Sequence, residues 1–154
     1  MPVNIKNQKE EKRAMLTKSL GLPKNTRAIL LSFVENEDIK LFLREACEAL
    51  SIKLITGIDD TAIEWADAFV TDTFHDNLPL RALLSSHVVP IIPATSRYEK
   101  IFREFNPMKF EGNAFIFDEA NKYLIFEKIV RYLENIRYPW DKRTLLQNIE
   151  KTSL

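Results

Sequence analysis

The chain has 154 residues, of which 45% are hydrophobic, so it can form one domain with a core of ordinary size. Lys+Arg and Asp+Glu are equal at 22 each, which gives no long-range attraction to nucleic acid or to anionic membranes. No apolar run approaches the roughly 20 residues of a membrane span, the first residues do not resemble a secretory signal, and Cys47 has no second cysteine to pair with. We therefore expect a cytoplasmic protein with one domain over 1–154, no nucleic-acid partner and no membrane span.

Helical and strand patterns alternate along the chain. A charged segment over 5–20 is predicted as a helix that ends at Gly21. Short apolar runs are then predicted as five strands: 27–34, 52–56, 68–71, 88–92 and 114–117. Helices are predicted between and after these strands. The first is capped by Asn36 and ends at Leu50, and the last is capped by Asp141 and ends at about 151. The others are 62–66, 78–85 with Asn77 as its cap, 98–105 and 122–137.

This alternation predicts an α/β fold. We expect a single Rossmann-like three-layer domain, with a five-stranded parallel sheet, helices on both faces and an extra helix at the N- and C-terminal ends. The strands lack polar alternation, as strands buried on both faces do. Pro90 lies within the fourth run and cannot donate to a ladder, so that strand is expected to be irregular or near an edge.

The glycine count limits the ways in which the chain could bind a nucleotide. The three glycines, Gly21, Gly57 and Gly112, are widely separated, whereas phosphate-binding loops cluster glycines over a few residues. The chain therefore has neither a P-loop nor a G-x-G-x-x-G turn. With two histidines it also lacks a His-rich metal site, and we predict no metal and no cofactor.

The candidate site follows from the predicted sheet, because open parallel sheets bind ligands beyond the carboxyl ends of their strands. The loop after the third strand, TDTFHDN, is the richest in polar groups that could hold a sugar hydroxyl or transfer a proton. The same residue types are also ordinary helix caps, and we favour that interpretation. The ligand-binding candidates over the whole chain are Asp72, Thr73, His75, Asp76, Arg81, Thr95 and Asn113.

Other polar and aromatic residues have two interpretations each. The cluster Glu35, Glu37 and Asp38 could bind a divalent cation, but acidic residues in a first helical turn more often complement the helix dipole. Cys47 is expected in the core rather than as a nucleophile. The two tryptophans could stack on a sugar or base, but buried packing is favoured for Trp65 and for Trp140.

Four segments resemble, in order, the C-terminal domain of GT-B glycosyltransferases, the group that includes glycogen and starch synthases. They are KRAMLTKSLGLPKNTRAILLSF, IEWADAFVTDTFHDNLPLRALLSSHVVPIIPA, EGNAFIFDEANKYLIFEKIVRYLEN and DKRTLLQNI. The resemblance covers most of the chain and implies the sugar-nucleotide-binding half of such an enzyme. If active, the chain would be a hexosyl-type glycosyltransferase that needs a partner subunit with the acceptor domain.

The departures from that family concern its binding residues. The family carries two glutamates in its central segment that contact the donor sugar nucleotide. Aligned on Leu78-Pro79-Leu80, these positions hold Phe74 and Ala82 here. The family's glycine-rich turn and basic pair after the first strand are also missing, and the acidic residues found there would repel a diphosphate. The region before Ala66 is shorter than in the family by about one strand–helix unit.

Three functions therefore remain open. The first is a split or degenerate glycosyltransferase half that binds a nucleotide sugar, and the second is a non-catalytic protein-interaction module that acts with a partner protein or as a homo-oligomer. The third is a receiver-like signalling domain, with Asp72 at the end of the third strand. A receiver has lysine after the fifth strand, where this chain has Asp118, so this third interpretation is the least favoured.

Overall fold

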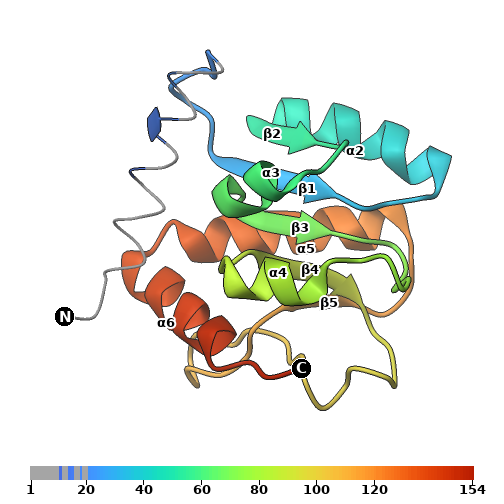
Figure 1. The fold of residues 1–154 in the computed structure, drawn as a ribbon, viewed down its shortest axis with the longest axis vertical. Helices are drawn as coiled ribbons and strands as arrows, with labels where there is room; N and C mark the ends of the chain where they lie inside the picture. The colour runs from blue at the N-terminus through green and yellow to red at the C-terminus, as the bar shows by residue number, and fades with distance from the viewer. Residues whose placement is uncertain (1–10, 12–13, 16–17, 19–20) are drawn as a thin grey trace.

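The computed structural model describes residues 11, 14–15, 18 and 21–154. Its centre is one parallel sheet in the order β2-β1-β3-β4-β5 (Figure 1). The strands are β1 (Ala28–Ser32), β2 (Ile52–Ile55), β3 (Ala68–Val70), β4 (Val89–Pro93) and β5 (Phe115–Phe117). All four neighbouring pairs are parallel, so the predicted five-stranded parallel sheet is confirmed.

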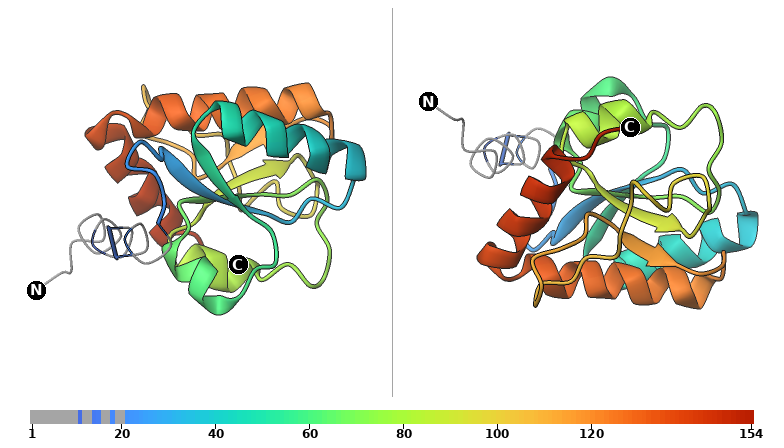
Figure 2. Two further views of the ribbon diagram at one scale, coloured as in Figure 1. Left: turned by 90° about the horizontal axis from the view of Figure 1, so that it is seen from above. Right: turned by 90° about the horizontal axis from the view of Figure 1, so that it is seen from below.

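Helices cover both faces of the sheet, which gives the three-layer α/β domain that the sequence predicts. The described helices are α2 (Glu37–Ala49), α3 (Asp60–Trp65), α4 (Leu80–Ser85), α5 (Lys122–Ile136) and α6 (Pro139–Glu150). Figure 2 shows α2 and α5 on one face and α3 and α4 on the other, with α6 beside α4. Most of the helix predicted over 5–20 lies outside the described residues.

The two long helices form where caps and apolar spacing agree. Asn36 caps α2 because its side chain accepts a hydrogen bond from the Ile39 N–H at 3.0 Å. Asn121 caps α5 in the same way, with the Tyr123 N–H at 2.9 Å. Each helix then turns one apolar stripe toward the sheet, which includes Leu43 of α2 and Ile129 of α5.

The predicted helix over 98–105 is wrong. Residues 98–101 form turns, and the backbone from Arg103 onward instead pairs with the approach to β5. Asn113 draws it there, because its side-chain oxygen accepts from the Arg103 N–H at 2.9 Å and its Nδ2 donates to the Ile101 carbonyl at 2.9 Å. These contacts join residues ten or more positions apart, so local propensity does not decide this segment.

Two predicted caps are also wrong. Asn77 lies in a turn closed by a 3.1 Å hydrogen bond from the Leu78 N–H to the His75 carbonyl, and α4 begins at Leu80, with Pro79 in the cap position. The last helix begins at Pro139 rather than after Asp141. Proline suits the first helical position, because its missing N–H has no partner there in any case, and Asp141 then lies in the first turn of α6.

Of two expectations about individual residues, that of a buried Trp140 fails and that for Pro90 is met in part. Pro90 lies in β4, which is regular and is the neighbour of the edge strand β5. Val89 donates to the Asp67 carbonyl on the β3 side, so the Pro90 nitrogen faces β5, whose pairing begins only at Ile91. Trp140 is exposed, whereas Trp65 is half-buried and packs against the core, as predicted.

The core is a continuous apolar cluster around the sheet, with β1 and β3 almost completely buried at its centre. Cys47 belongs to this cluster, as predicted. No helix among the described residues combines the length and the apolar character that crossing a membrane requires.

Candidate functional site

The strand order of the sheet reverses between β1 and β3, which is the topological switch point of the fold. From β1 it passes to β2 on one side, and the following strand, β3, returns to the other side of β1. Open α/β sheets bind ligands at such a point, in the crevice beyond the carboxyl ends of the two strands. The site is therefore formed by the segment after β1, which leads into α2, and by the segment after β3, which begins with Thr71 and Asp72.

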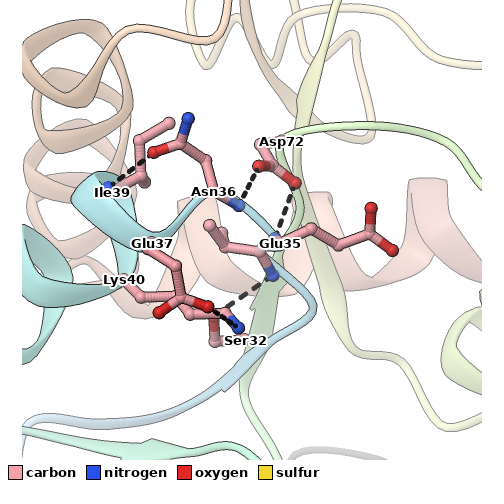
Figure 3. Close-up of polar contacts among 8 residues, drawn as sticks. Ser32, Glu35, Asn36, Glu37, Ile39, Lys40 and Asp72 are labelled. Atoms are coloured by element: carbon pink, nitrogen blue, oxygen red, sulfur yellow. Dashed lines mark hydrogen bonds and ion pairs between the residues drawn. The ribbon is translucent and has the colours of Figure 1, made fainter.

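Asp72 occupies this crevice with its own carboxylate. Its Oδ1 accepts a hydrogen bond from the Glu35 N–H at 3.1 Å, and its Oδ2 accepts from the Asn36 N–H at 2.9 Å (Figure 3). The side chain is buried, with the residue only 6% exposed. Both carboxylate oxygens therefore hold the loop after β1 against the end of β3.

The two N–H groups that Asp72 binds lie where an anionic ligand would bind. Backbone N–H groups at the start of a helix are a common phosphate-binding arrangement, and the charge of a carboxylate is the same in sign. In the structure both donors are held by the Asp72 carboxylate. The sequence placed Asp72 at this edge of the sheet correctly, and its role as a ligand-binding group stays a prediction.

The rest of the loop after β3 gives weaker contacts. Thr71 donates its hydroxyl to the Thr73 carbonyl at 2.6 Å, which fixes the backbone and leaves the Thr73 residue exposed. The His75 Nε2 lies 3.9 Å from Glu35 Oε1, and the Asp76 Oδ1 lies 3.9 Å from Arg97 Nη1. Asp76 and Arg97 are both solvent-exposed, so water and salt screen their attraction strongly.

An aromatic pair stands beside these polar groups. The rings of Phe74 and Tyr98 have centroids 4.6 Å apart, and the Arg97 guanidinium lies 5.1 Å from the centre of the Tyr98 ring. Thr95 is close by, where it lines a small cavity of about 110 Å³ with Tyr98 and Phe102. Phe74 thus packs against an aromatic ring beside the polar groups of the loop after β3.

Two predicted candidates lie elsewhere. Arg81 of α4 lines a groove of about 340 Å³ that it shares with Thr152, next to the end of α6. Asn113 precedes β5, at the amino ends of the strands, and its amide also donates to the Thr152 hydroxyl at 2.7 Å. The structure therefore brings together Asp72, Thr73, His75, Asp76 and Thr95 at one edge, and separates Arg81 and Asn113 from them.

The acidic residues after β1 have partners of their own. Glu37 pairs with Lys40 at 3.1 Å, and Asp38 lies 4.0 Å from Lys122 of α5. In the part of the chain that the structure describes, no three His, Cys, Asp or Glu side chains come together as a metal site. The positions of Glu37 and Asp38 in the first turn of α2 fit the helix-dipole interpretation.

No protein-family model matches the chain, and the comparison with curated proteins gives no significant match. The resemblance to GT-B glycosyltransferases therefore rests on the four sequence segments alone.

The sequence did not single out Glu104, a carboxylate outside this crevice that holds two elements together. Its Oε2 accepts from the Ile116 N–H at 2.6 Å, and its Oε1 accepts from the Lys128 Nζ at 2.8 Å. Glu104 lies in the segment wrongly predicted as a helix. Its carboxylate accepts the hydrogen bond that a neighbouring strand would otherwise accept from β5, and no local sequence pattern indicates such a contact.

Proposed function

We propose that the chain is a non-catalytic protein-interaction module, built on a fold that resembles the sugar-nucleotide half of a GT-B glycosyltransferase. The observation that carries this proposal is the Asp72 carboxylate, which takes both N–H donors at the crevice between β1 and β3. Two further features argue against diphosphate binding. The acidic loop after β1 would repel a diphosphate, and Phe74, which packs against Tyr98, offers it no polar contact. We also propose a cytoplasmic location.

The strand order is the one that a larger nucleotide-binding domain would have after the loss of one strand–helix unit, and other doubly wound folds share it. The nucleotide-binding order 3-2-1-4-5-6 becomes 2-1-3-4-5 when its third strand and the following helix are removed. The chain has this shorter order, and its sequence is short by about one such unit in the region before Ala66. The removed strand would have been the neighbour of β2 at the sheet edge.

The direct test is ligand binding by the whole chain. We expect no change in melting temperature with UDP-glucose or ADP-glucose at millimolar concentration, because the N–H donors are occupied. Affinity capture with the purified chain should instead recover a protein partner or a second copy. A saturable rise in melting temperature with either nucleotide sugar contradicts the proposal.

A second candidate function is nucleotide-sugar binding together with a partner that supplies an acceptor domain. The adjacent side chains of Phe74, Tyr98 and Arg97 favour it, since aromatic faces and guanidinium groups can stack on a base or a sugar. If this candidate is correct, Tyr98→Ala should abolish the thermal shift, whereas Tyr123→Ala, an exposed tyrosine on α5, should leave it unchanged.

The receiver-like interpretation receives less support. The strand order 2-1-3-4-5 is the one that receiver domains have. A phosphate acceptor, however, needs a carboxylate that can reach a phosphodonor, and both oxygens of Asp72 are held by backbone N–H groups. Treatment with acetyl phosphate should leave the mass of the protein unchanged.

A further inference from the structure

The turn before β5 and the junction of α5 with α6 form an exposed apolar surface, which we call the junction surface. It consists of Met108 from the turn and Tyr138 from the junction, which line one groove and are 87% and 57% exposed. Phe110 of the turn and Trp140 of the junction are also exposed, at 58% and 62%, and lie outside the lining of that groove. Figure 2 shows the turn beside the α5–α6 junction in both views. Methionine and tyrosine are residue types enriched in protein interfaces, and here they line one groove, so we consider the junction surface as a binding surface.

The turn that carries Met108 and Phe110 is held firmly. The Asn106 N–H donates to the Glu111 carbonyl at 2.7 Å, and the Met108 N–H donates to Asn106 Oδ1 at 3.0 Å. Asn148 of α6 donates from Nδ2 to the Phe110 and Gly112 carbonyls at 3.3 and 2.9 Å. A surface fixed in this way loses little conformational entropy when it binds.

A groove lies directly beside the turn. It has a volume of about 740 Å³, and its lining includes Met108, Tyr138, Arg131, Arg137, Glu134 and Asp141. Met108 is the most exposed large apolar side chain in the described part of the chain, and it stands at the groove's rim. A projecting apolar group and a receiving groove are therefore adjacent on one face.

The charges of the groove indicate what kind of partner fits. Two arginines, Arg131 and Arg137, alternate with two carboxylates, Glu134 and Asp141. The remaining carboxylate, Glu104, pairs with Lys128 at 2.8 Å and lies 4.0 Å from Arg131 of the same chain. Arg131 is therefore partly neutralised, and Arg137 is the arginine left to meet a partner's carboxylate. A nucleic acid or a partner of one charge sign would meet repulsion here, whereas a partner with the same mixed pattern would not.

The residue types agree with a protein interface. Methionine, tyrosine, tryptophan and arginine are enriched in such interfaces. The Arg137 guanidinium lies 5.9 Å from the centre of the Tyr138 ring, and the Arg143 guanidinium lies 5.9 Å from that of Trp140. The planar guanidinium groups of these arginines lie next to the exposed rings and add to the surface that a partner could contact.

We propose that the junction surface binds a second copy of this chain in a two-fold dimer. Met108 of each copy enters the groove of the other, and Arg137 of each faces Asp141 of the other. A two-fold axis requires a self-complementary patch, and the adjacent projection, groove and mixed charges provide one. This inference deepens the proposed function by naming the partner, and self-association and nucleotide binding have separate measurements, so either can fail alone.

The first experiment measures association of the full chain by sedimentation velocity over a range of concentrations. We expect a concentration-dependent dimer, and we expect Met108→Asp to raise its dissociation constant at least about tenfold. Leu41→Asp is the matched control, because Leu41 is an exposed apolar residue on α2, far along the chain from the junction surface, and it should leave the dimer unchanged. A chain that stays monomeric, or a dimer indifferent to Met108→Asp, overturns the proposal.

The second experiment tests the two-fold arrangement by charge reversal. Arg137→Glu alone puts two carboxylates together at both contacts, and Asp141→Arg alone puts two arginines together, so each variant should be monomeric. Mixed in equal amounts, the two variants restore opposite charges at both contacts and should form a heterodimer. Failure of the mixture to associate, while each variant stays folded by circular dichroism, contradicts the arrangement.

Discussion

Gly112 is the glycine that the structure constrains most closely of the three in the chain. Its φ is +93°, and a Cβ at this position would collide with the Glu104 carbonyl and the Phe105 Cα. We therefore expect Gly112→Ala to lower the free energy of unfolding by more than about 2 kcal/mol, because strain and a backbone clash add together. Urea unfolding followed by circular dichroism measures this change.

Gly57 provides the matched control for that substitution. A Cβ there meets no atom within 4 Å. Gly57→Ala should shift the free energy of unfolding by less than about 1 kcal/mol, because it mainly restricts the unfolded chain. Equal losses at the two glycines would show that backbone approach at Gly112 is not the cause.

Because Cys47 is buried, we expect the free energy of unfolding to change at alkaline pH. Burial raises the pKa of its thiol from 9.0 to about 12. Below about pH 9 the thiol is protonated in both the folded and the unfolded chain, and it adds no pH dependence. Between these values the unfolded chain releases the proton while the folded chain keeps it, so the free energy of unfolding falls as pH rises.

The measurement compares urea unfolding of the parent and of Cys47→Ala between pH 8 and pH 10.5. The variant should be less stable at pH 8, because it loses buried side-chain volume. It should also lose less stability as the pH rises. Parallel pH profiles would indicate that Cys47 ionises equally easily in both states.

At the scale of the elements, the outer edge of β5 is closed by a side chain. The Ile116 N–H points away from β4 and donates to Glu104 at 2.6 Å, where a neighbouring strand would otherwise accept it. Glu104→Ala should cost about 2 kcal/mol, since it removes charged hydrogen bonds to both Ile116 and the largely buried Lys128. Glu104→Gln should cost less, because its side-chain oxygen can still accept from Ile116.

Glu99→Ala is the control for the β5 edge. Glu99 is an exposed residue in the same segment, and its loss should change the free energy of unfolding by less than about 0.5 kcal/mol. Thermal unfolding of the three variants side by side measures the difference. If Glu104→Ala and Glu99→Ala behave alike, the carboxylate does not stabilise the edge.

The elements that the sequence predicted well are those determined by local pattern. The apolar runs gave all five strands, and Asn36 gave the start of α2, because a cap and a buried stripe act within a few residues. The segment 98–105 failed because Asn113 and Ala114 hold it from a distance. Asn77 failed because the turn that contains it closes on His75 before α4 begins.

At the scale of the whole molecule, the sequence predicted where the candidate site lies, but not the contacts that its residues make. The rule for parallel sheets put the loops after β1 and β3 at one edge, and the register of Ser32 with Val70 confirms that neighbourhood. Whether Asp72 faces solvent or the Glu35 and Asn36 N–H groups depends on how the loop after β1 curves. Such long-range geometry has no signature in one sequence.

The occupied crevice leads to a prediction about the molecule as a whole. Asp72→Ala removes the internal anion and leaves the Glu35 and Asn36 N–H groups without it, so we expect a loss of about 3 kcal/mol in the free energy of unfolding. The freed donors at the start of α2 should then bind an external anion. Sulfate should therefore raise the melting temperature of Asp72→Ala more than it raises that of the parent.

The excess over the parent is the decisive quantity, because sulfate stabilises folded proteins in general. Asp76→Ala serves as the control, since its carboxylate is almost fully exposed and lies 3.9 Å from Arg97 rather than against backbone N–H groups. It should respond to sulfate as the parent does. An excess response of Asp72→Ala means that the crevice still has the donors of an anion site and that one carboxylate keeps it closed. Equal responses in all three proteins would mean that the crevice has no residual anion site, and Asp72 would then be a structural tie between β3 and the loop after β1.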